Sequence, residues 1–204
     1  MSIKQIPASD FKLAVIDSSL HNPIAVFFTA SWCEPCQEVN ALLETVAKEY
    51  EERLNIAVID IDDKEVDQVL DDCKVESIPD LKLFHKKELV AQAKGVLSKV
   101  QIDKLLEPYV LTEQQHRIHV LEKQIEILLA SEQYEEAQSI VGIYSSKYPL
   151  DQEVKLIEIA IAVKMNLIDL ASQLIQALPT TLKENAKAKE VIGLIENMQH
   201  QTVQ

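Results

Sequence analysis

The stretch Ile24-Ala25-Val26-Phe27-Phe28-Thr29-Ala30-Ser31-Trp32-Cys33-Glu34-Pro35-Cys36 decides the fold of this chain. Its first six residues are apolar, aromatic or β-branched, which predicts a buried strand. Apolar residues recur at helical spacing directly after the second cysteine, so a helix is expected to begin at the cysteine pair. A strand that leads into Cys-x-x-Cys at a helix start is typical of a redox-active dithiol. The chain is therefore a candidate for thiol–disulfide chemistry.

The two cysteines are expected to have different tasks, because the reactive form of cysteine is the thiolate. Cys33 lies at the predicted helix N-terminus, where unpaired N–H groups and the helix dipole favour a thiolate. Pro35 is compatible with the first helical turn, which needs no N–H donor. Cys36, one turn further on, is placed to attack a mixed disulfide on Cys33 and release the product. Trp32 offers a flat apolar wall beside the exposed sulfur.

A zinc half-site, or a pair of structural cysteines, is the alternative interpretation. Zinc would need a second pair of ligands, and the nearest candidates, Cys73 and His85, do not stand at ligand spacing. We therefore expect no metal and no other cofactor. Cys73 shares a predicted helix face with Val66, Val69 and Leu70, which favours a buried, inert thiol over a third redox residue.

Composition and charge argue against several classes of function. The chain has 204 residues, 47% of them hydrophobic, and three glycines, which indicates a helix-rich globular protein of one or two domains. A net charge of −13 without a basic stripe argues against nucleic acid and anionic membranes as partners. No stretch approaches the roughly 20 apolar residues of a membrane span. Residues 1–7 lack the apolar segment of a signal peptide, so a reducing, cytoplasmic location is expected.

The first half of the chain alternates predicted strands and helices. From Ile24 onward the order is β-α-β-α-β-β-α, which implies a mixed sheet with helices on both faces. A helix over 10–20, with Ser9 as its N-cap, is expected to precede this series. The predicted strands are 24–29, 54–61, 81–84 and 89–94, and the later predicted helices are 34–53, 64–73 and 100–110.

The second half reads as helix throughout and contains an internal repeat. An offset of 34 residues relates two sets of positions, which are Tyr134, Ala137, Ile140 and Val141 in the first and Ile168, Ala171, Leu174 and Ile175 in the second. That offset is the period of tetratricopeptide repeats, which pair two helices. An arbitrary helical bundle is the alternative. The sequence thus predicts an α/β domain over 1–110 and a tetratricopeptide-like helical domain over 111–204.

Residues 1–110 resemble the thioredoxin family. Trp32-Cys33-Glu34-Pro35-Cys36 stands where the family has Trp-Cys-Gly-Pro-Cys, Ile78-Pro79 stands where it has a cis-proline, and Gly95 matches the glycine after its hairpin. The resemblance implies an α/β thioredoxin fold and protein-disulfide reductase activity. It implies Cys33 and Cys36 as catalytic residues and Glu34 and Pro35 as motif residues. The residues that inherit substrate contact are Trp32, Ile78 and Pro79.

Four positions depart from the family pattern. The family has a buried aspartate where this chain has Phe27. The lysine that neighbours this aspartate in the family aligns near Val58 of this chain. Because that aspartate is thought to accept the proton of the second cysteine, its absence predicts slower deprotonation of Cys36. The Glu34 carboxylate opposes thiolate formation at the adjacent cysteine. Asp80, which follows the cis-proline position, is expected to add negative charge at the substrate groove.

The whole architecture resembles a narrower group, the bacterial thioredoxin–tetratricopeptide fusions of the YbbN/CnoX type, called chaperedoxins, here in a C-terminally shortened form. This resemblance implies mixed disulfides with client proteins that have disulfides or exposed apolar segments, and a role in redox homeostasis and protein quality control. It also implies a thioredoxin reductase or glutathione system as reductant and the GroEL chaperonin as partner. The alternative is a non-catalytic holdase or chaperone-binding scaffold on a thioredoxin fold.

Overall fold

The protein, as a computed structural model, is described for residues 3–202, with side chains described for 3–193 and 195. It divides into two compact units, Met1–Glu113 and Gln114–Gln204. Met1, Ser2, Val203 and Gln204 lie outside the described residues. None of the described helices is long and apolar enough to cross a membrane.

The first unit is built on a five-stranded sheet with the order β1-β3-β2-β4-β5. Its strands are β1 (Ile3–Gln5), β2 (Ile24–Thr29), β3 (Asn55–Asp60), β4 (Asp80–His85) and β5 (Glu88–Lys94). The first three strands of that order pair in parallel, whereas β4 runs antiparallel to β2 and β5 antiparallel to β4. The mixed sheet is therefore confirmed. The prediction missed β1, which has only three residues and is too short to show a period.

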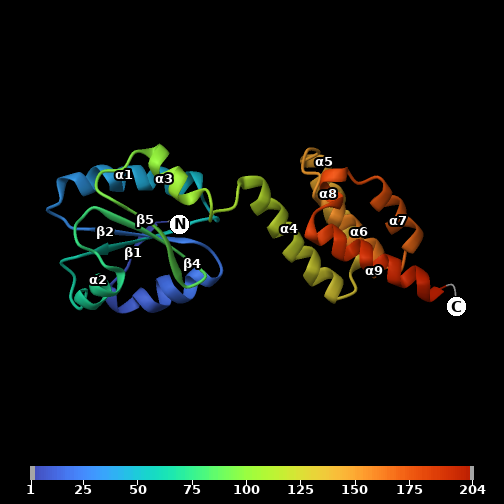
Figure 1. The fold of residues 1–204 in the computed structure, drawn as a ribbon, viewed down its shortest axis with the longest axis horizontal. Helices are drawn as coiled ribbons and strands as arrows, with labels where there is room; N and C mark the ends of the chain where they lie inside the picture. Colours follow the sequence, from blue (N-terminus) through green and yellow to red (C-terminus); the bar gives the residue numbers. More distant parts are fainter. Residues whose placement is uncertain (1–2, 203–204) are drawn as a thin grey trace. The chain divides into compact units, whose positions relative to one another are not determined.

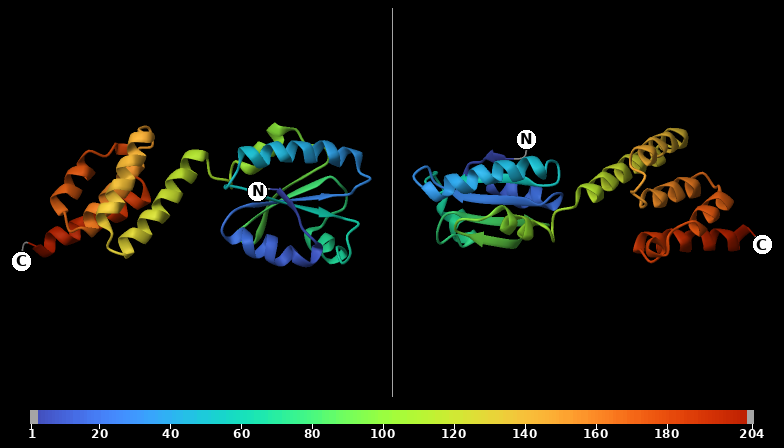
Figure 2. Two further views of the ribbon diagram at one scale, coloured as in Figure 1. Left: turned by 180° about the vertical axis from the view of Figure 1, so that it is seen from behind. Right: turned by 90° about the horizontal axis from the view of Figure 1, so that it is seen from above.

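Helices cover both faces of this sheet (Figure 1). On one face lie α1 (Glu34–Glu49) and α3 (Lys99–Leu106). On the other lie α2 (Asp67–Cys73) and the segments η1 (Ala8–Asp10), η2 (Lys12–Asp17) and η3 (Ser18–Leu20), and the view from behind in Figure 2 shows the same layers.

The predicted helix over 10–20 is wrong in its details. The chain forms a 3₁₀ turn, a π-helical turn and another 3₁₀ turn there. Ser9 is not the N-cap, because its hydroxyl donates to the Asp10 carboxylate and Pro7 precedes the first turn.

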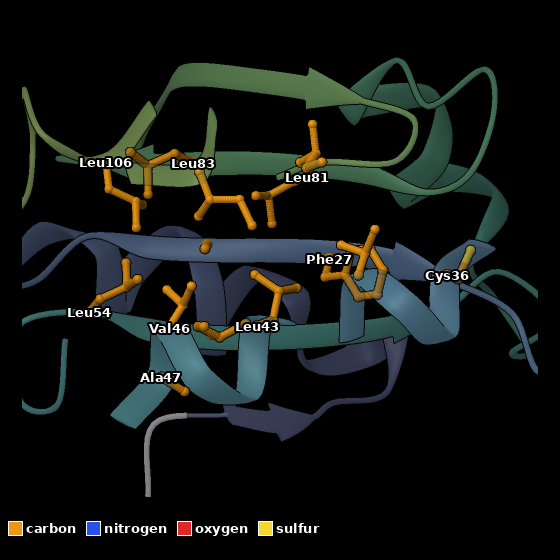
Figure 3. Packing of buried hydrophobic residues seen from close by; sticks show 14 of the residues in the cluster. Phe27, Cys36, Leu43, Val46, Ala47, Leu54, Leu81, Leu83 and Leu106 are labelled. Atoms are coloured by element: carbon orange, nitrogen blue, oxygen red, sulfur yellow. The ribbon is translucent and has the colours of Figure 1, made fainter. Parts of the chain in front are cut away.

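Strand β2 is buried on both sides, which explains why it reads as a continuous apolar run. Its side chains alternate between two apolar clusters. Ala25 and Phe27 belong to the cluster under α1 and α3, and Val26 and Phe28 belong to the cluster under α2. Figure 3 shows the first of these clusters, in which Phe27 and Cys36 are labelled. Each fully buried large apolar side chain contributes about 1.5–3 kcal/mol relative to its exposed state.

The second unit is helical throughout its described length. Its helices, the first of which begins at the end of the first unit, are α4 (Glu113–Ala130), α5 (Tyr134–Lys147), α6 (Val154–Lys164), α7 (Ile168–Gln176), α8 (Thr180–Lys183) and α9 (Ala186–Thr202). One apolar cluster is shared by α4, α5 and α6, and another by α6, α7 and α9. Ala137 and Ala171 are both fully buried in these clusters. The small residues of the 34-residue offset therefore both lie where helices pack.

Candidate redox site

The cysteine pair lies just after the central strand β2, at the start of helix α1. After β2 ends at Thr29, Cys33 takes an extended backbone conformation and forms the N-cap of α1, and Pro35 lies in the first turn. Cys33 and Cys36 form a disulfide with 5.3 Å between their Cα atoms. The strand and helix that flank the motif thus bring the two sulfur atoms together, as the spacing of the residues indicates.

The two cysteines are almost enclosed, although their neighbours are not. Cys33 is 5% exposed and Cys36 is 1% exposed, whereas Trp32 is 66% exposed. Glu34 and Pro35 are exposed as well. The indole and the first turn of α1 are therefore exposed, whereas the two cysteines are buried.

The indole of Trp32 is held by a residue that sequence reasoning missed. Its Nε1–H donates to a carboxylate oxygen of Asp62, with 2.7 Å between the heavy atoms. The loop after β3 is joined to the end of β2 because the Ile61 amide donates to the Thr29 carbonyl at 2.9 Å. In the sequence, the acidic run 60–63 stands out only because it lies at the end of a predicted central strand. No pattern in the sequence links this run to Trp32.

The predicted substrate-contact segment contains the expected cis-proline. The peptide bond between Ile78 and Pro79 is cis. Ile78 is half-buried and packs against both apolar clusters of the first unit, and Pro79 is buried. The carbonyl of Pro79 accepts a hydrogen bond from the Gly95 amide at 2.8 Å. This bond ties the segment to the end of β5, where Val96 is 58% exposed.

The residue that replaces the family's buried aspartate, Phe27, lies in apolar surroundings in the structure. Phe27 is fully buried in the same cluster as Cys36. Its register partner on β3 is Val58, where a lysine would be expected in the family. Position 27 therefore offers no side-chain proton acceptor to Cys36.

One expectation about charge is wrong. The sequence places the Asp80 carboxylate at the substrate groove, but the side chain is fully buried and forms an ion pair with Lys82. The reason is strand alternation: Leu81 and Leu83 face the cluster under α1, so Asp80 and Lys82 face the opposite side of the sheet.

Cys73 is buried at the end of α2, as predicted for an inert thiol. Burial raises the pKa of its thiol to about 11, with a smaller opposing effect of the Lys82 ammonium. At pH 8, a pKa higher by about two units lowers the thiolate fraction about 100-fold.

We expect iodoacetamide at pH 8 to alkylate Cys73 at least about 100-fold more slowly in the folded, oxidised protein than in the urea-unfolded protein. Mass spectrometry of timed samples measures both rates on the same thiol. Equal rates in the two states would show that α2 does not protect this cysteine.

Among the residues that the structure describes, there is no group of three or more histidine, cysteine or acidic side chains that could hold a metal ion. Neither Cys73 nor His85 joins the redox pair as a ligand set.

Comparisons with known proteins agree on the first half of the chain. The family model described as Thioredoxin matches residues 2–108. A thioredoxin-like protein of Synechocystis is 31% identical over 106 residues, which cover 52% of this chain and 94% of that protein. The thioredoxin of Porphyra purpurea is 32% identical over 110 residues, 54% of this chain and 99% of that protein. The thioredoxin of Buchnera aphidicola is 37% identical over 100 residues, 49% of this chain and 88% of that protein.

Proposed function

Because the chain belongs to the thioredoxin family, whose model matches just over half of it, we propose that it exchanges disulfides with client proteins through Cys33 and Cys36. The observation that carries this proposal is the Cys33–Cys36 disulfide at the N-terminus of α1. A helix N-terminus favours the thiolate of Cys33, which is the nucleophile that exchange requires.

The proposed exchange has two steps. The Cys33 thiolate attacks one sulfur of a client disulfide, so that a Cys33–client bond forms while the client bond breaks, and the released client thiolate takes up a proton. Cys36 then loses its proton to solvent and attacks the Cys33 sulfur. The Cys33–Cys36 disulfide forms and the second client thiol leaves. The client gains two electrons, and a thioredoxin reductase or glutathione system returns two electrons to the protein.

The client is proposed to lie along Trp32, Ile78 and Pro79. Three observations support this placement. The indole is exposed and oriented by Asp62. Pro79 is bonded to the end of β5, beside the exposed Val96. Trp32 and Val96 follow the ends of β2 and β5, and Pro79 precedes β4; the strand register places these three strand ends next to one another, at the cysteine end of the sheet.

We further propose that the protein is a chaperedoxin-type thioredoxin–tetratricopeptide fusion that acts in cytoplasmic protein quality control. The support is the helical second unit, in which Ala137 and Ala171 are equivalent by a 34-residue offset and both fully buried. That unit would contact clients with exposed apolar segments and the GroEL chaperonin. Phe27 supports the alternative of a holdase or chaperone-binding scaffold, because the buried position 27 offers no carboxylate to Cys36.

A trapping experiment tests the redox proposal. With Cys36→Ser the second step is blocked, so clients should stay attached to Cys33 by reducible bonds. The variant carries an affinity tag, and adducts released by dithiothreitol are identified by mass spectrometry. Cys33→Ser/Cys36→Ser should hold none, and Cys36→Ser/Cys73→Ser should hold the same set. If Cys36→Ser holds no adducts, the redox proposal fails. Full suppression of heat-induced client aggregation by Cys33→Ser/Cys36→Ser would then favour the holdase.

A further inference from the structure

A buried ion pair lies at the start of β4, directly after the cis-proline. Asp80 and Lys82 have fully buried side chains, and 3.1 Å separates Nζ of Lys82 from Oδ2 of Asp80. Nζ also donates to Oε1 of Gln92 on β5 at 3.0 Å. Neither Asp80 oxygen accepts a hydrogen bond of good geometry from the described residues. The carboxylate is therefore held by the charge of Lys82.

Stability does not explain this pair. Two charges lose their hydration on burial, and well-packed apolar residues of similar volume often serve a fold equally well or better. Apolar residues could take the place of the ion pair here, because the nearby residues on this face include Val26, Phe28 and Ile59. The best-attested use of a buried polar pair is to fix one register of packing among several.

Register matters at this position because side chains alternate along a strand. A slip of β4 by one residue would turn Asp80 and Lys82 to the opposite face of the sheet, into the cluster under α1, and would separate Lys82 from Gln92. Gln92 stands directly opposite Lys82 on β5, so the same contact also fixes the edge strand. The pair thus sets where β4 begins, and the residue before that beginning is Pro79.

A second ion pair holds the other side of the same segment. Lys94, directly opposite Asp80 on β5, binds Glu76 with 2.6 Å between the charged atoms. The segment from Glu76 to Asp80 is therefore anchored by one exposed pair and one buried pair, with the Pro79–Gly95 hydrogen bond between them.

We propose that Asp80 and Lys82 are positioning residues that fix the segment 76–79 for the binding of an extended client peptide. This inference rests on the proposed function, because it concerns how the same site recognises its client. The two residues do not touch the client or the sulfur atoms. They act through Pro79, so their removal should change peptide recognition and leave the reactivity of Cys33 unaltered.

The test compares a peptide disulfide with a small one. Steady-state exchange is measured, in full-length protein with dithiothreitol as reductant, on an extended disulfide-linked peptide and on a small aromatic disulfide, which has no peptide backbone to pair with the segment 76–79. In Asp80→Leu/Lys82→Met, we expect KM for the peptide to rise about five- to tenfold, since small misplacements of positioning groups have large effects. We expect kcat and the rate with the small disulfide to change by less than about 1.3-fold.

The control is the exposed pair Asp17 and Lys87, 2.8 Å apart. Asp17→Asn/Lys87→Met removes the same charges from the surface and should leave KM unchanged. Gln92→Leu, measured in parallel, removes only the hydrogen bond to Lys82. It should raise peptide KM about twofold, which keeps the proposal testable if the double variant does not fold.

An unchanged peptide KM in the folded double variant would overturn the proposal. An equal loss of exchange rate on the peptide disulfide and on the small disulfide would also overturn it. If the double variant does not fold, an unchanged KM in Gln92→Leu would overturn it. Wild-type protein that exchanges neither disulfide would refute the proposed function itself, and this inference with it.

Discussion

Cys33→Ser is expected to lower the rate of disulfide exchange at least about 10³-fold, because a hydroxyl cannot replace the thiolate that forms the first bond to the client. The rate is measured by reduction of insulin in the presence of excess dithiothreitol, after subtraction of the uncatalysed reaction. Among single substitutions in the site, only Cys36→Ser, which blocks the second step, should have an effect of comparable size.

Cys73→Ser is the matched control, because it also replaces one thiol by a hydroxyl. It should keep its rate within about twofold, since a buried thiol with a raised pKa takes no part in exchange at neutral pH. If Cys33→Ser kept more than about a tenth of the wild-type rate, another group would have to be the nucleophile, and the assignment of Cys33 would be wrong.

Lys82→Met is expected to lower the free energy of unfolding by about 3–5 kcal/mol, because it leaves the Asp80 carboxylate buried without a counter-charge. Urea denaturation followed by circular dichroism measures this loss. Asp80→Leu/Lys82→Met should recover most of it, since no isolated charge then remains in the cluster.

Lys87→Met provides the comparison on the surface. It breaks the exposed pair with Asp17, and such pairs contribute only about 0–1 kcal/mol. A loss in Lys82→Met as small as the loss in Lys87→Met would mean that the buried carboxylate finds water or protonates at little cost. In that case the buried pair would not fix the register of β4.

The sequence was a reliable guide where one pattern sufficed. The run at β2, the cysteine spacing and the helical pattern of α1 are local signals, and together they predicted the mixed sheet and the place of the cysteine pair. Pro79 was identified by its resemblance to the family's cis-proline, and the structure has a cis bond there. The helices of the second half were found in the same way, from apolar residues at helical spacing.

Features that depend on pairing between distant segments could not be predicted. Asp62 meets Trp32 only because β3 lies beside β2, and the two residues are 30 positions apart. Asp80 looked like a surface charge because its burial depends on Lys82 and on the edge strand that carries Gln92. The 3₁₀ and π turns between residues 8 and 20 have no signal in the sequence, because Phe11 and Val15 stand four residues apart, which is also the spacing of one face of a regular α-helix.

The arrangement of buried side chains also bears on how this chain can evolve. Among the residues whose side chains the structure describes, two apolar clusters have their buried members within 6–110 and two within 118–195, so that each of these clusters belongs to one unit. A substitution that repacks one cluster in the helical unit needs no compensating change at the sheet. Selection can therefore preserve the first half while the helical half diverges.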